Sequence, residues 1–255
     1  FRYGLRINSN LIQDLRSNKI PVITGYSNNV PQQSYFNWPY SPLLFSDSKH
    51  VISNGLDAIK CEFVSSIDTI KNNIHKTILL HSSNKSRLIP SPSKISLGIL
   101  ENPPLLTSYN KKFLPIAILL EGEFESLFKD KLVQKNNKIK FIKKSASNKM
   151  IVVSDGDLIA NDISKSGVIY PLGYDKNINF TFNGNKHFLI NAVQYLCGDN
   201  SLSHLKLKDL SLRMLDKKKI QENRFIIQLI NIALPILLLI TLALFFISYK
   251  KRKYA

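Results

Sequence analysis

The chain is organised around one apolar run, FIIQLINIALPILLLITLALFFISY, which occupies residues 225–249. The run has no charged residue and is bounded by Arg224 and by KKRK at residues 250–253. At about 1.5 Å per residue, a helix of this length reaches roughly 37 Å, enough to cross a hydrocarbon core of about 30 Å. Its position near the end of the chain excludes a signal peptide. The sequence therefore predicts a C-terminal membrane span.

Basic residues on both flanks of the span bear on its orientation. Under the positive-inside rule, the cluster at 250–253 favours a cytoplasmic tail. The lysines at 217–219, together with Arg224, compete from the other flank. Because the C-terminal cluster is denser, charge favours an extracytoplasmic body by a small margin.

Two amides and a proline give the span a polar face. Gln228 and Asn231 are three residues apart, and Pro235 continues their face and removes one backbone hydrogen bond. Amides in lipid prefer another helix to acyl chains, so this face is a candidate contact with a partner helix. The alternative is that both amides lie near the membrane interface and are hydrated.

The net charge of +17 invites a nucleic-acid interpretation, but its distribution argues against one. Nearly half of the excess lies after residue 200, beside the span, where it suits anionic headgroups. The remainder is mostly Lys, and it forms no basic stripe interleaved with aromatic residues. We therefore expect membrane lipid, and no nucleic acid, as a partner.

The cysteines and histidines indicate no metal site. Cys61 and Cys197 lack CxxC spacing, and either form one disulfide or are two small buried residues. The five histidines are scattered along the chain. We expect neither a metal nor a cofactor.

The chain starts at Phe1 with FRYGLRINSN, which is typical of the middle of a domain. It has no initiator Met and no apolar leader, so we expect an N-terminal part to precede it. Residues 1–200 are expected to form one extracytoplasmic α/β domain. Residues 201–224 would form a strand and a helical stalk, 225–249 the span, and 250–255 a basic cytoplasmic tail.

The first half of the body alternates helix and strand signals. Asn8 or Ser9 can cap a short helix over residues 10–17, and the apolar run at 20–24 predicts a strand. Helix followed by strand is the unit of an α/β sheet. Further strands are predicted at residues 61–67 and 76–81, which are apolar or β-branched with polar borders.

Two long apolar runs follow, at residues 115–128 and 149–162. Each ends in acidic residues and Gly, as buried strands do at a functional sheet edge. The Lys/Asn-rich tract between them, 129–149, is expected to be a solvated insertion.

Helical spacing returns at residues 185–196, with Asn185 as the predicted cap and Gly198 as the stop. Alternation at residues 210–214 predicts a strand, and Asp216 is placed to cap a helix that continues into the span.

An aromatic stretch at residues 26–45 is expected to be irregular because prolines interrupt it. Trp38 and Tyr40 lie within it as candidate partner contacts. The alternative is that these aromatic residues tether a loop to the body.

Acidic residues are the candidates for chemistry. Glu121 and Glu123 alternate on a predicted strand, where crowded carboxylates can raise one pKa for acid/base work. Asp155 and Asp157 bracket Gly156, which suits a hard cation. The alternative is that Asp157 caps a turn and the glutamates pair with lysines. Because no His or Cys lies at a fixed spacing and no phosphate-binding loop is present, we assign no catalytic residue and expect no ATP hydrolysis.

Six segments in order resemble the C-terminal half of the gliding-motility-associated ABC transporter component of the GldG type. They are GLRINSNLIQDL, ILLEGEFESLF, KMIVVSDGDLIAND, NKHFLINAVQYL, LSLRMLDKKKI and the apolar run with KKRK. The resemblance covers nearly the whole chain.

This resemblance implies an α/β, Rossmann-like domain of flavodoxin- or amidotransferase-like type, outside the cytoplasm and anchored in the bacterial inner membrane. It implies a non-enzymatic, substrate-binding-like accessory subunit that works beside an ABC permease subunit and a separate ATPase subunit. Two alternatives remain: a membrane-tethered module that binds envelope glycan or peptide through the aromatic stretch, and a carboxylate-dependent hydrolase.

Overall fold

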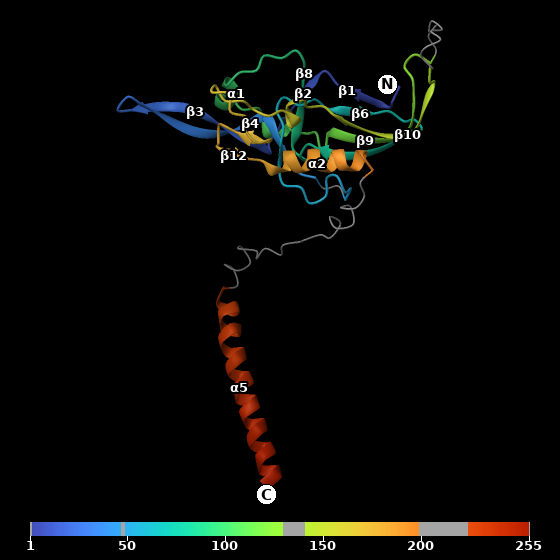
Figure 1. Cartoon of the computed structure of the whole chain (residues 1–255). Coiled ribbons are helices and arrows are strands. Elements are labelled where there is room, and N and C mark those ends of the chain that lie inside the picture. The colour runs from blue at the N-terminus through green and yellow to red at the C-terminus, as the bar shows by residue number, and fades with distance from the viewer. Residues whose placement is uncertain (1, 47–48, 130–140, 199–223, 255) are drawn as a thin grey trace. The chain divides into compact units, whose positions relative to one another are not determined.

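The computed structural model describes residues 2–46, 49–129, 141–198 and 224–254 (Figure 1). The chain divides into two units, Phe1–Asp209 and Leu210–Ala255, and each is described by itself. The first combines strands and short helices, and the second contains one long helix.

The centre of the first unit is an antiparallel sheet in the order β10–β9–β7. Its strands are β10 (Lys144–Val153), β9 (Pro115–Glu125) and β7 (His75–His81). The apolar run of β9 is buried from Ile116 to Leu120 because it is covered on both faces. Leu119 packs in one cluster with Phe188, whereas Ile118 and Leu120 pack in a second cluster with Ile67. The predicted strands at 76–81, 115–128 and 149–162 are thus confirmed in their apolar parts.

Shorter antiparallel pairs surround this sheet. They are β1 (Leu5–Ile7) with β6 (Ile67–Thr69), β2 (Asn10–Asp14) with β8 (Ser86–Pro90), and β11 (Tyr174–Asp175) with β12 (Phe180–Thr181). All the strand pairs in the described ranges are antiparallel. The Rossmann-like arrangement is therefore not confirmed, since parallel strands need crossover connections and these strands lack them.

A long hairpin replaces the irregular stretch expected at residues 26–45, so that prediction was wrong. β3 (Ser17–Ser27) pairs with β4 (Val30–Leu44), whose last residues pair with β5 (Ile59–Lys60). Asn28 and Asn29 both have positive φ, as a two-residue hairpin turn requires. The predicted strand at 20–24 lies within β3. Figure 1 shows this hairpin extending away from the rest of the body.

The helix predicted at residues 10–17 was also wrong, because these residues form β2 and the start of β3. Asp14 is buried and accepts hydrogen bonds from the backbone N–H and the hydroxyl of Ser83, at 2.7 and 2.6 Å. Such distant partners override local helix signals. The predicted strand at 61–67 lies mostly between β5 and β6, in residues without regular structure.

The helices of the body are short, apart from α2 (Asn183–Leu196), which lies along the central sheet in Figure 1. The others are α1 (Gly98–Glu101), η1 (Leu106–Ser108) and η2 (Asp157–Ile159). α2 confirms the predicted helix, but Phe182 occupies its N-cap and Asn185 does not cap it. Part of the expected 129–149 insertion belongs to β10, and residues 130–140 lie outside the described residues. The predicted strand at 210–214 and the predicted cap at Asp216 also lie outside the described residues.

The second unit contains α5 (Arg224–Tyr254), with Pro235 inside it. Its Gln228–Ile247 stretch is 20 residues long, has a mean hydropathy of 2.7 and is not buried within the structure. By length and composition, α5 is therefore a candidate membrane span.

Candidate functional site

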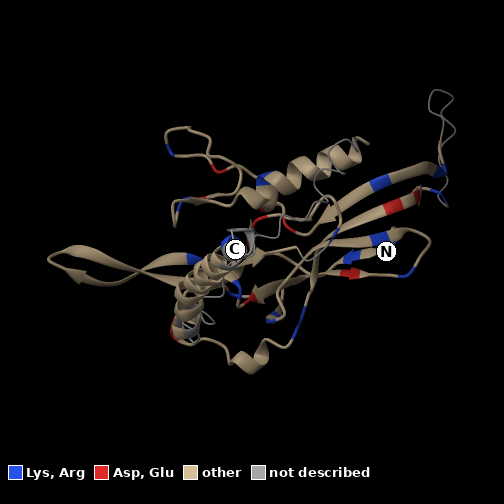
Figure 2. Cartoon of the chain, turned by 90° about the horizontal axis from the view of Figure 1, so that it is seen from below, with Lys and Arg blue, Asp and Glu red and all other residues tan. Residues whose placement is uncertain are grey.

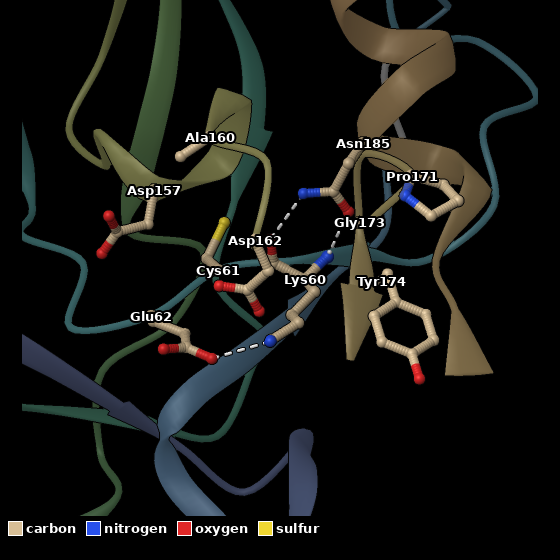
Figure 3. Close-up of a pocket in the computed structure, with 10 residues that line it drawn as sticks. All are labelled: Lys60, Cys61, Glu62, Asp157, Ala160, Asp162, Pro171, Gly173, Tyr174 and Asn185. Carbon is tan, nitrogen blue, oxygen red and sulfur yellow. Dashed lines mark hydrogen bonds and ion pairs between the residues drawn. The ribbon is translucent and has the colours of Figure 1, made fainter. Parts of the chain in front are cut away.

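A polar cavity of about 210 Å³ opens where the end of β5, the turn after β10 and the start of α2 meet (Figure 3). It is lined by Lys60, Cys61, Glu62, Asp157, Ala160, Asp162, Pro171, Gly173, Tyr174 and Asn185. Apart from Asp157, the sequence had not singled out these residues as a site. They come from separate segments, so spacing along the chain does not reveal them.

An ion-pair network holds one wall of the cavity. Lys60 Nζ lies 2.8 Å from Asp175 Oδ2 and 2.8 Å from Glu62 Oε1. Asp175 is 1% exposed and also accepts a hydrogen bond from Asn18 Nδ2 at 2.6 Å. Burial alone would lower the pKa of Lys60, but hydrogen bonds to the Asp175 and Glu62 carboxylates raise it. Burial opposes ionisation of Asp175 too, yet Lys60 holds the pKa of Asp175 below its usual value.

Asn185 holds the backbone of the cavity lining. Its Oδ1 accepts the Lys60 backbone N–H at 2.9 Å, and its Nδ2 donates to the carbonyls of Lys60 at 2.8 Å and Leu158 at 3.2 Å. The preceding Gly184 makes this approach possible, because a Cβ there would collide with the carbonyls of Asp57 and Ala58. One buried amide therefore joins α2, β5 and η2.

Asp155 does not line the cavity, but it holds the backbone of two residues that do. Its carboxylate is buried and accepts the backbone N–H groups of Glu62 at 3.0 Å and Asp157 at 2.8 Å. Burial raises the pKa of Asp155, although these N–H groups act in the opposite direction. The Cys61 thiol hydrogen-bonds to the same carboxylate, and burial followed by the Asp155 charge raises the pKa of this thiol well above its usual value. A thiol held in this neutral form is a poor nucleophile.

Asp157 does not cap the helical turn in which it lies, although the sequence had suggested this role. The helical turn η2 has no side-chain cap, so the predicted capping role of Asp157 was wrong. The turn is held by Asp155 instead, and Asp157 is exposed at the cavity. Cys61 and Cys197 are both free thiols, which excludes the disulfide between them.

Glu121 and Glu123 lie on β9, apart from the residues that line the cavity. Glu121 Oε1 accepts the Tyr195 hydroxyl hydrogen bond at 2.8 Å and lies 3.9 Å from Lys149 Nζ. Burial and the neighbouring Glu121 raise the pKa of Tyr195 to about 12. Glu123 forms an ion pair with Lys144. Both glutamates are thus paired with lysines, as the alternative interpretation of the sequence proposed.

Trp38 and Tyr40 lie at the base of the hairpin. Tyr40 is 4% exposed, and its ring packs 5.2 Å from that of Trp38 and 6.0 Å from that of Phe63. These contacts fit the alternative in which Trp38 and Tyr40 attach this stretch to the body rather than contact a partner. The exposed aromatic residues of the hairpin are Tyr26, Tyr35 and Phe36.

Gln228 and Asn231 are both exposed on α5, with Pro235 four residues further on. Their spacing keeps the three on one side of the helix, as predicted. A partner helix on this face stays a prediction.

Two of the groups that line the cavity are engaged in contacts within the protein. The Lys60 ammonium group is engaged by two carboxylates, and the Cys61 thiol is held neutral. Asp157 and Asp162 also line the cavity, and their carboxylates can accept hydrogen bonds from cations or from ligands rich in donors. Within the described part of the chain, no three His, Cys, Asp or Glu side chains cluster as a metal site would require.

Comparison with known proteins assigns the chain to a family. No curated protein and no solved structure matches it. One family model, described as an ABC-type uncharacterized transport system, matches residues 1–192, which include all the residues of the cavity and the hairpin. Because this match spans most of the sequence, the chain belongs to that family of ABC transporter auxiliary components.

Proposed function

We propose that the chain is a membrane-anchored, non-enzymatic accessory subunit of an ABC transporter of the gliding-motility type. The observation that carries the proposal is the order of two features: an ABC auxiliary family match over residues 1–192, followed by the apolar stretch Gln228–Ile247. In this proposal residues 1–200 form the extracytoplasmic body, 201–224 the stalk, 225–249 the span and 250–255 the cytoplasmic tail, in the bacterial inner membrane.

The side chains at the cavity support a binding role. General acid/base catalysis needs a group poised near neutral pH, and nucleophilic catalysis needs an activated nucleophile. Lys60 and Asp175 stabilise each other's charges, Asp155 accepts two backbone N–H groups, and the Cys61 thiol has a raised pKa. These groups make structural contacts within the body, which favours binding over hydrolysis at this cavity.

Copurification tests the proposal. The full-length chain, extracted in mild detergent from its own cells, should bring down a multispan permease and a separate ATPase. Gln228→Leu together with Asn231→Leu should weaken this recovery without loss of membrane insertion, because an interhelical hydrogen bond in lipid contributes about 0.6–2 kcal/mol. Recovery of the wild-type chain alone in several detergents would contradict the proposal.

The native cysteines provide a test of orientation. Cys197 is exposed and Cys61 is buried, so a membrane-impermeant thiol reagent should label Cys197 in cells whose outer barrier alone has been opened. Cys197→Ser is the matched control and should abolish the labelling. Labelling that requires disruption of the inner membrane would place the body in the cytoplasm.

The cavity favours one second candidate, a membrane-tethered module that binds a small envelope glycan or peptide. Asp157 and Asp162 offer acceptors to hydroxyl or ammonium groups. Titration calorimetry of the full-length chain with envelope sugars and short cationic peptides tests this candidate. Asp162→Asn should weaken any such binding, and Asp57→Asn, in the same body but not among the lining residues, is the control.

A further inference from the structure

The hairpin has an outer part that the body does not cover. Residues 20–37, named here the arm, include eight consecutive exposed residues at the start of β4, from Val30 to Asn37. Tyr26 is 72% exposed, Val30 64% and Tyr35 54%. Large apolar side chains in such positions mark interaction surfaces when they are grouped.

Both faces of the arm carry apolar side chains. Residues opposite one another in an antiparallel ladder share a face, and successive residues alternate between faces. One face has Ile20 opposite Phe36, and the other has Pro21 opposite Tyr35 and Tyr26 opposite Pro31. A partner that covers the arm must therefore contact it from two sides.

The arm also differs from the rest of the chain in charge. Charged residues make up 21% of the sequence, but none occurs from residue 20 to residue 46. In Figure 2 the hairpin carries neither blue nor red beyond its base. Desolvation of charge is costly at an interface core, so an uncharged surface of this length fits an uncharged partner surface.

Several occupants can be set aside. Lipid is disfavoured because the tip is polar, at Ser27, Asn28 and Asn29, and because unpaired strand edges cannot be satisfied by acyl chains. A second copy is disfavoured by the net charge of +17 on each chain. Glycan sites enclose their ligand in a cleft, whereas the arm is exposed on both faces. Pro21 and Pro31 lack N–H groups, which also discourages strand addition along the edges.

We propose that the arm inserts into an uncharged groove of another protein subunit of the same transport system. The inference rests on the proposed function, since it takes the transporter as the source of the partner. Side chains on both faces make the contact, and the Asn and Gln residues near the tip supply hydrogen bonds to the walls of the groove.

The test compares charged substitutions in and outside the arm of the full-length chain. Ile23→Asp with Tyr35→Asp places carboxylates in the proposed interface, and Leu106→Asp with Ile169→Asp places them at exposed apolar sites elsewhere. The arm variant should recover the permease and ATPase at least about tenfold less efficiently than wild type, whereas the control should stay within about twofold. Protection of buried Cys61 from thiol reagents verifies the fold of both variants.

Photocrosslinking identifies what the arm touches. Benzoylphenylalanine in place of Tyr35 should crosslink to another subunit of the transport system, and the same group in place of Ile169 should not. Equal recovery by the arm variant, or a Tyr35 crosslink only to lipid or to a second copy, would overturn the inference and leave the proposed function intact. A wild-type chain that recovers no transporter subunit would overturn both.

Discussion

Strand β9 and the arm are both antiparallel strand structures, yet they are stabilised in different ways. From Ile116 to Leu120, β9 is fully buried, and two of its three charged residues, Glu121 and Glu123, pair with lysines of β10. The arm has a ladder of main-chain pairs but little covering, and it has no charged side chain. An isolated two-stranded hairpin is only marginally stable in water. Residues 116–120 of β9 are thus stabilised by the body, whereas the arm lacks such covering, and we propose that a partner subunit supplies it.

The largest stability effect is expected in the buried ion pair of the body. Lys60→Met leaves the Asp175 carboxylate buried without its cation, which should cost about 3–5 kcal/mol. Tyr35→Met in the arm, a comparable change at an exposed site, should alter stability by about 0.5 kcal/mol or less. Urea unfolding of the full-length chain in detergent, followed by Trp38 fluorescence, measures both.

The same pair makes a prediction about pH. Asp175 has a pKa below its usual 3.8 in the folded chain, so its contribution to stability is present above that value and is lost as the pH falls through the lowered pKa. In Lys60→Met, burial without the cation should raise the pKa of Asp175 above its usual value. The difference in unfolding free energy between wild type and Lys60→Met should therefore be largest at neutral pH, shrink as the pH falls through that raised pKa, and level off below the lowered pKa of the wild type. A difference that does not change with pH would show that Lys60 acts through packing alone.

Truncation of the core strand should come next. Leu119→Ala opens a cavity in a fully buried cluster and should cost about 2–5 kcal/mol. Tyr35→Ala should leave the unfolding midpoint nearly unchanged while it reduces recovery of the transporter subunits. Equal destabilisation by the two substitutions would remove the distinction between core strand and arm.

The turn after β10 offers a smaller comparison between a buried residue, Asp155, and an exposed one, Asp157. Asp155→Ala removes the acceptor of two backbone N–H groups and should cost about 1–3 kcal/mol. Asp157→Asn, two residues away and exposed, should change stability by about 0.5 kcal/mol or less. Thermal unfolding of the two variants checks this order, and the reverse order would restore the capping role to Asp157.

The smallest effect is expected at the tip of the arm. Asn29 has φ 61° in the hairpin turn, where Gly is preferred, so Asn29→Gly should stabilise the arm by a few tenths of a kcal/mol. Global unfolding should not respond. Slower amide exchange in β3 and β4 alone would confirm that the arm is a local unit.

The elements that the sequence predicted correctly share one property, namely that their own residues indicate the environment in which they lie. The apolar runs of β9 and β10, the helical spacing of α2 and the charge-free run 225–249 of α5 each indicate an environment locally. Residues 10–14 instead carried a helix signal that pairing with β8 overrides. The prolines and asparagines of the arm were typical of a loop, although its edges and its turn accommodate them.

The candidate site was harder to predict than the fold. Asp155 and Asp157 were identified from the Gly between them, but Lys60, Asp175 and Asn185 are brought together only by tertiary structure. Asn185 was interpreted as a helix cap because Asn is common there. Its partners are Lys60 on β5 and Leu158 in η2, 125 and 27 residues away in the sequence, and no local pattern predicts them.

Hydrogen exchange tests the central claim most directly. In the full-length chain purified alone, amides of residues 20–37 should exchange rapidly and those of β9 slowly, because only β9 is buried by the body. In the complex with the other transporter subunits, exchange in the arm should slow by at least about tenfold, while β9 stays unchanged. An arm that exchanges equally fast in the chain alone and in the complex would contradict the claim that a partner subunit completes it.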